Sequence, residues 1–170
     1  MTTQSAALGT MMVRELTSLR QEVEAYPSDA DLWRVVPGIV NSGGTLALHL
    51  AGNLQHFVGA ILGGSLYVRN REAEFTTRDL SRADVVRLVD DAIAAVQLTF
   101  RNLDPADLGL QYPEPVAKVH LNTGDFLTHL ASHLAYHLGQ VDYHRRIVTG
   151  NPATVGTVAP GKLSSARPVE

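Results

Sequence analysis

The sequence predicts an all-α protein, a four-helix bundle with long connections. Four segments repeat apolar side chains at the 3.6-residue spacing of an amphipathic helix. Proline and glycine, which end helices, separate these segments. Hydrophobic residues make up 45% of the 170-residue chain and charged residues 18%, so there is enough apolar material for one packed core.

The first two helices are bounded by clear local signals. The first is expected over about residues 7–25, because Pro27 disfavours helical backbone at the residue before it. The second is expected over about residues 45–61, with Thr45 as its N-cap and Gly63 at its C-terminal end.

The third and fourth helices follow longer connections. The third is expected from Ser81, its N-cap, to about Leu103. The fourth is the longest and runs from about residue 122 to Gly150.

The four helices place residues 1–150 in a single domain. Residues 151–170 contain Pro, Gly and Ser and few large apolar groups, so we expect a C-terminal tail. The polar connection over residues 65–80 is long for a compact domain, and such loops are more often functional or interface-forming than idle.

Composition excludes several classes of function. The chain has no cysteine, so a metal must be held by imidazole, carboxylate or carbonyl groups. Its net charge is -3 and Lys occurs only at Lys118 and Lys162, so no nucleic-acid partner is expected. There is neither an uninterrupted apolar span nor a signal-peptide pattern, so we expect no membrane segment and a cytoplasmic location.

The fourth helix carries a row of histidines at every fourth position. His129, His133 and His137 therefore follow one another by one turn, an offset at which two imidazoles close on one metal ion. On a helical wheel His133 and His137 face the bundle interior with the apolar residues, and His129 lies at the edge of that stripe.

Two interpretations fit the inward pair. The histidines either bind a metal or lie in the core, hydrogen-bonded to neighbours or water, because a buried imidazole needs one or the other. A metal site needs a further ligand, and the second helix offers His49 and His56, which spacing alone does not separate.

These residues resemble a known family. His49-Leu50-Ala51-Gly52-Asn53, together with His133-x-x-x-His137-x-Gly139-Gln140, is similar to the DinB/YfiT-like superfamily of metalloenzymes. The segment from Arg69 to Phe75 resembles an uncharacterised branch of that superfamily.

The resemblance implies a DinB-like four-helix bundle, often homodimeric, with His49, His133 and His137 holding a divalent metal, commonly nickel or zinc. It implies a metal-dependent hydrolase or a transferase that uses a low-molecular-weight thiol, acting on a small-molecule substrate. The alternative is a non-enzymatic dimeric bundle that binds a metal or small ligand.

Four more residues are candidates for the surroundings of the site. Asn53 and Gln140 lie about one turn beyond His49 and His137, where they either orient a ligand or fill a polar gap in the bundle. Tyr136 either lines the mouth of a pocket or packs in the core or an interface. His129 is either a further ligand or an acid/base group near the site, or it lies on a solvated flank of the helix.

The charged side chains of the long connection have three interpretations. Arg69, Arg71 and Glu74 bind an anionic substrate, pair across a dimer, or form a solvated surface. The length of the connection favours an interface or a pocket rim.

Overall fold

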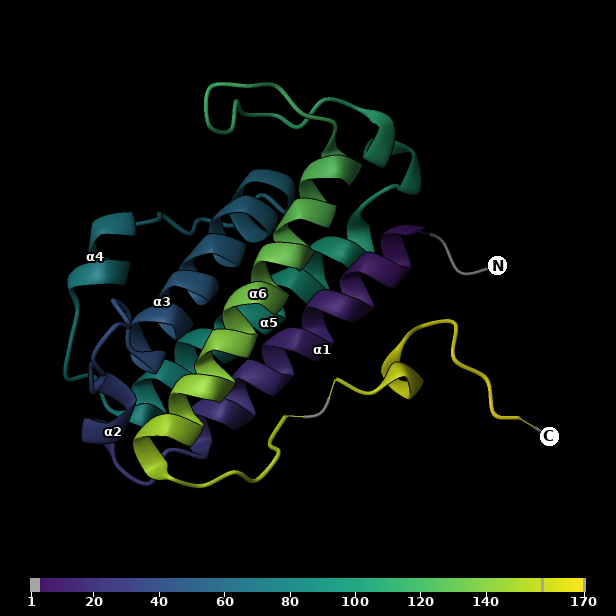
Figure 1. The fold of residues 1–170 in the computed structure, drawn as a ribbon. Coiled ribbons are helices and arrows are strands. Elements are labelled where there is room, and N and C mark those ends of the chain that lie inside the picture. Colours follow the sequence, from purple (N-terminus) through teal and green to yellow (C-terminus); the bar gives the residue numbers. More distant parts are fainter. Residues whose placement is uncertain (1–3, 157, 170) are drawn as a thin grey trace.

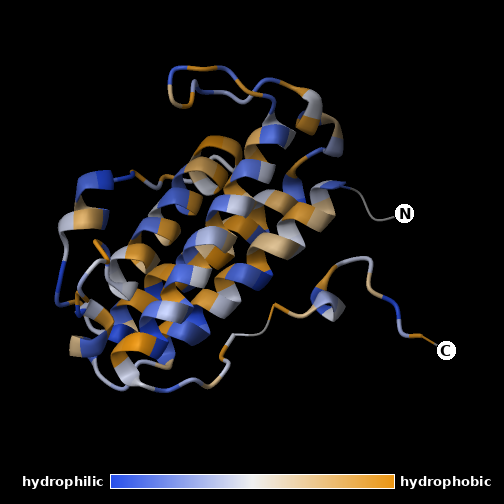
Figure 2. Ribbon diagram, viewed as in Figure 1, coloured by the Kyte–Doolittle hydropathy of each residue, from blue (hydrophilic) through white to orange (hydrophobic). Residues whose placement is uncertain are grey.

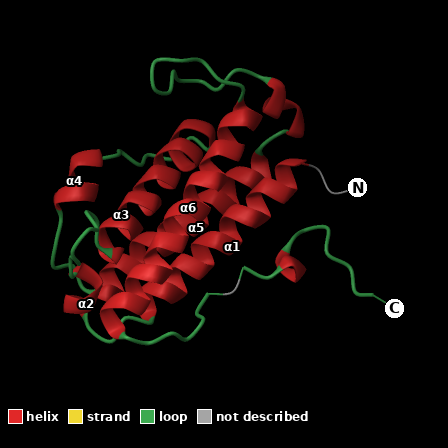
Figure 3. Cartoon of the chain, viewed as in Figure 1, coloured by secondary structure: helices red, strands yellow, loops and turns green. Residues whose placement is uncertain are grey.

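The computed structural model describes residues 4–156 and 158–169 of the chain. Within these residues, four long helical elements lie side by side as a bundle (Figure 1) and no β-strand forms (Figure 3). They are α1 (Gln4–Glu24), α3 (Gly43–Leu54) continued by the π-helix η1 (Gln55–Leu62), α5 (Arg82–Asn102) and α6 (Thr123–Thr149). The all-α fold predicted from the sequence is confirmed.

Short helices occupy the connections. They are α2 (Asp29–Trp33), α4 (Arg71–Thr76) and the 3₁₀ helices η2 (Pro105–Gly109) and η3 (Pro160–Lys162). Helix α4 lies inside the connection that we expected to be a loop, and it begins where the Asn70 side chain accepts a hydrogen bond from the Ala73 N–H at 3.0 Å. Its six residues are too few to show a helical period in the sequence.

The second long helix ends at Gly63 as predicted but differs from the prediction at its start and in the type of its second half. Its N-cap is Ser42, not Thr45, because the Ser42 hydroxyl accepts a hydrogen bond from the Thr45 N–H at 3.2 Å. After Leu54 the backbone widens into the π-helix, in which the Gly63 N–H bonds the Val58 carbonyl at 3.0 Å. The 100° spacing of an α-helical wheel therefore no longer applies beyond this point.

The core lies between the apolar faces of the long helices. Hydrophilic and hydrophobic residues alternate around each helix, as an amphipathic bundle requires (Figure 2). The buried residues include Met12, Leu16, Leu50, Leu54, Val89, Val96, Leu130 and Leu134. None of the helices in the described residues combines the length and apolar character needed to cross a bilayer.

A buried histidine closes one end of the bundle. His144 is 1% exposed, and its Nδ1 accepts a hydrogen bond from the Tyr26 hydroxyl at 2.7 Å. Its Nε2–H donates to the Arg34 carbonyl at 2.8 Å, so both ring nitrogens are used by the neutral imidazole. Burial lowers the pKa of His144 below its ordinary value.

This histidine makes stability depend on pH. Because its folded-state pKa lies below the ordinary value of 6.5, the unfolded chain binds more protons in the window between those two values. We expect the free energy of unfolding to fall as the pH is lowered through that window and to be independent of His144 above it. Urea unfolding near pH 7.5 and pH 5.5 measures the fall, which should be smaller in His144→Gln. Equal falls in the two proteins would contradict the assignment.

Candidate metal centre

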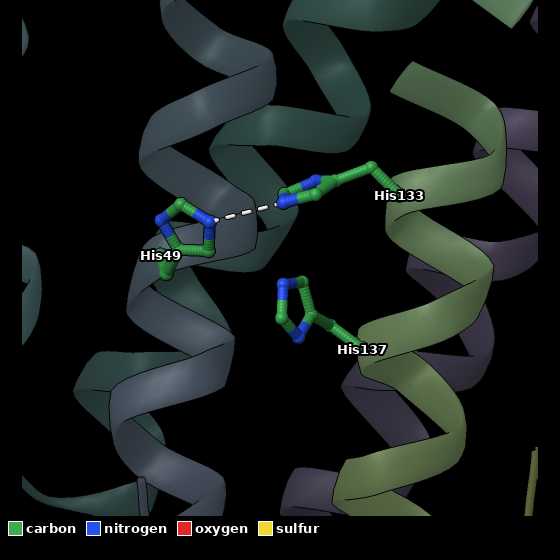
Figure 4. Close-up of side chains that lie close together, drawn as sticks. All are labelled: His49, His133 and His137. Carbon is green, nitrogen blue, oxygen red and sulfur yellow. Dashed lines mark hydrogen bonds between the residues drawn. The ribbon is translucent and has the colours of Figure 1, made fainter. Parts of the chain in front are cut away.

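Three imidazoles from two neighbouring helices point toward one another (Figure 4). His49 comes from α3, and His133 and His137 come from α6. One ligand atom from each residue lies within 4.8 Å of the other two, and the Nε2 atoms of His49 and His133 are 3.3 Å apart. The three histidines named from the sequence are thus brought together.

His56 lies outside this group. It falls in the π-helical segment, where its ring packs against Phe57 with centroids 4.7 Å apart. The resemblance chose His49 over His56 where spacing had left both open, and the arrangement agrees with that choice.

Hydrogen bonds fix the tautomers of two of the three histidines. The Nδ1 of His49 lies 2.9 Å from Oε2 of Glu74, and a carboxylate only accepts, so this nitrogen carries the proton. The Nδ1 of His137 lies 2.7 Å from the amide oxygen of Gln140, which likewise only accepts. Both residues therefore present an unprotonated Nε2 to the centre of the group.

His133 is held neutral by its surroundings. Burial is the main cause that lowers its pKa to about 4, and the neighbouring His137 and His49 lower it further. Its buried Nδ1 has no hydrogen-bond partner within the described residues, and neither has the buried Oδ1 of Asn53 on α3. A neutral imidazole at pH 7 has a lone pair available for a metal.

The geometry fits a divalent ion held by imidazoles. Two nitrogen ligands of one tetrahedral zinc ion, each about 2.0–2.1 Å from it, lie roughly 3.4 Å apart. The 3.3 Å between the Nε2 atoms of His49 and His133 meets this requirement, and a ligand atom of His137 lies within 4.8 Å of a ligand atom of each of the other two. An all-imidazole set suits zinc, nickel, copper and iron.

Glu74 was named from the sequence only as one of the loop charges, and its pairing with a histidine of this site was not predicted. It is 5% exposed and bonds His49, while Arg69 donates to its Oε1 at 2.6 Å and its Oε2 at 2.8 Å. Burial alone raises the pKa of Glu74, but the hydrogen bonds from Arg69 and His49 outweigh it and the pKa is lowered. A solvated surface, one of the three interpretations of these charges, is therefore wrong for Arg69 and Glu74.

The same short helix packs an aromatic ring on the site. Phe75 lies against His49 with ring centroids 4.9 Å apart, and the Arg71 guanidinium lies 5.0 Å from the Phe75 ring centroid. The only sequence signal for these contacts is the mixed Arg and Glu pattern that follows the helix carrying His49. Such a pattern does not indicate which residue each charge will contact.

The other candidate neighbours differ in how closely they approach. Gln140 bonds His137 directly, although its side chain reaches solvent. Tyr136 is 67% exposed and its ring lies edge-on to His137 at 5.2 Å. His129 is exposed and stacks on His133 at 6.2 Å, outside the group of three ligands. Since His133 and His137 are only half-buried, one side of the centre is open to solvent.

The fold and the site together define a class of protein: helical bundles with a candidate three-histidine metal centre between facing helices. Residues 11–141 match the family model of the DinB superfamily, and the chain belongs to that superfamily. A search of curated proteins found no match.

Proposed function

We propose that this DinB-superfamily protein binds one divalent metal ion through the Nε2 atoms of His49, His133 and His137. The observation that carries the proposal is the convergence of three imidazoles, two of which donate from Nδ1–H to an acceptor oxygen and so leave Nε2 free for a metal. The low pKa of His133 and membership of the superfamily both support it.

We further propose that the protein is an enzyme acting on a small molecule. Three neutral ligands and a half-exposed centre leave a coordination position that solvent and substrate can reach. A divalent ion supplies Lewis-acid chemistry there, polarising a bound water, thiol or carbonyl.

A cavity lined in part by Gln140 supports a substrate with an apolar portion. It measures about 390 Å³, and its lining includes Gln140, the hydrogen-bond partner of His137, but none of the three histidines themselves. Its walls include Ile39, Val40, Leu46 and Tyr143 together with the polar Asn41 and His144, and among the described residues no Asp, Glu, Lys or Arg lines it. An uncharged group fits such a wall better than an ionic one.

The most concrete form of this proposal is a transferase that uses a low-molecular-weight thiol, with nickel or zinc as the metal and a homodimer as the assembly. The resemblance of the histidine motifs to superfamily members with such activities supports it. A metal that stabilises the fold without turnover of any thiol–electrophile pair would favour the alternative, a non-enzymatic metal-binding bundle.

Metal content provides the direct test. Untagged protein, loaded in turn with nickel, zinc and manganese and then desalted, is expected to retain about one equivalent of at least one metal. Elemental mass spectrometry measures the retained amount. Less than about a tenth of an equivalent of every metal would remove the basis of the proposal.

A further inference from the structure

We propose that Glu74 is a positioning residue of the metal centre, and that Gly52 is kept as glycine to give its carboxylate room. The inference rests on the proposed metal binding. Contacts between α3 and the short helix α4 hold the His49 ring in place.

Both carboxylate oxygens of Glu74 are committed. Oε2 accepts from His49 at 2.9 Å and from Arg69 at 2.8 Å, and Oε1 accepts from Arg69 at 2.6 Å. The Arg69 guanidinium itself lies 5.4 Å from the Phe57 ring centroid, so an aromatic face on the ligand-bearing helix supports the pair. The carboxylate is therefore fixed from one side by arginine and presented to His49 on the other.

Gly52 makes this approach sterically allowed. A Cβ at this position would lie 2.4 Å from Oε1 of Glu74 and 3.0 Å from its carboxyl carbon. Gly52 is buried in α3, one turn beyond His49. Glycine weakens a helix interior relative to alanine, so its presence here calls for a packing reason, and the carboxylate supplies one.

The arrangement has a direct consequence for a metal ligand. A carboxylate on Nδ1 fixes the proton there, orients the ring and makes Nε2 a stronger donor. Loss of such a partner typically weakens metal binding by about 10–100-fold. We expect this reduction when Glu74 is changed, and also when Gly52 is changed, because an alanine Cβ displaces the carboxylate.

The experiment compares Glu74→Gln and Gly52→Ala with two matched controls. Glu72→Gln changes an exposed glutamate of the same helix, and Gly139→Ala adds a Cβ to a helical glycine that has no atom within 4 Å of that position. Zinc dissociation constants are measured by competition with a chromogenic chelator, and cobalt-loaded protein reports ligand geometry by visible absorption. We expect weaker binding by about 10–100-fold in the two test variants and less than about a twofold change in the controls.

A double-mutant cycle separates positioning from general damage to the fold. In a Glu74→Ala background the added Cβ of Gly52→Ala meets no carboxylate, so we expect it to cost no further affinity. An equal loss in both backgrounds would overturn the role of Gly52, and wild-type affinity in Glu74→Gln would overturn the role of Glu74. Both results differ from failure of the proposed function, in which the wild-type protein itself retains no metal. Melting of the metal-free proteins identifies any variant that loses affinity only because it unfolds.

Discussion

Replacing His133 with alanine is expected to lower retained metal from about one equivalent to less than about a tenth. The three imidazole rings form a compact triangle: the ring centroid of His133 is 5.1 Å from that of His49 and 4.6 Å from that of His137, and the last two are 5.5 Å apart. Without His133, one imidazole from each helix remains, and two neutral ligands hold a divalent ion poorly. The loss in affinity should exceed the roughly 100-fold upper range seen for partners that only support a ligand.

The matched control is His129→Ala, one turn earlier on the same helix. His129 is exposed and lies outside the group of ligand atoms, so its removal should leave metal content within about a fifth of wild type. Elemental mass spectrometry on both variants, with circular dichroism to verify folding, makes the comparison. Equal metal content in His133→Ala and wild type would show that His133 is not a ligand and that the metal binds elsewhere on the protein.

Periodicity predicted the part of the site that lies on one helix. His133 and His137 share a face because α6 is a regular α-helix over its whole length, so the wheel is valid there. The pairing of His137 with Gln140, three residues later, follows from the same regularity.

The contribution of the second ligand helix was harder to predict for physical reasons. His49 and His56 lie on one continuous helical element, and the tertiary fold determines which of them faces α6. The change to π-helix at Gln55 also changes the angle around the helix axis between the two residues, and no pattern in the sequence predicted this change.

The sequence could place Glu74 at an interface or a pocket rim, but it could not pair Glu74 with His49. Its bond to His49 spans 25 positions and depends on α4 folding back onto α3 at Gly52. A six-residue helix has no measurable period, and Arg and Glu in a polar connection are usually solvated. What identifies Glu74 is its burial together with its partners, which are properties of the tertiary structure.

A second large effect, on the free energy of unfolding, is expected at the buried ion pair of Arg145 and Glu22, which lies outside the group of three histidines. Arg145 is 1% exposed at the side chain and Glu22 is 2% exposed. Arg145 also donates to the Asn151 carbonyl at 3.3 Å and the Ala153 carbonyl at 2.8 Å, so it joins α1, α6 and the chain after α6. Burial raises the pKa of Glu22 despite the stabilising effect of Arg145 on its charged form.

Arg145→Met removes the cation and leaves a buried carboxylate without its partner. We expect the free energy of unfolding to fall by about 3–5 kcal/mol, which corresponds to a Tm decrease of roughly 6–20 °C for a chain of this length. Urea unfolding and thermal melting of the metal-free protein measure both quantities. Metal retention at a temperature where the variant is folded should stay near wild type, because the pair lies outside the group of three ligands.

The neighbouring arginine provides the control for this change. Arg146 shares the partner Asp142 with Arg145, but its side chain is 31% exposed and water screens the pair. Arg146→Met should therefore lower the free energy of unfolding much less than Arg145→Met does. Replacing both members of the buried pair, as in Glu22→Leu with Arg145→Met, should recover most of the stability because no unpaired charge remains in the core. If Arg145→Met and Arg146→Met lower stability equally, burial does not determine the contribution of this pair.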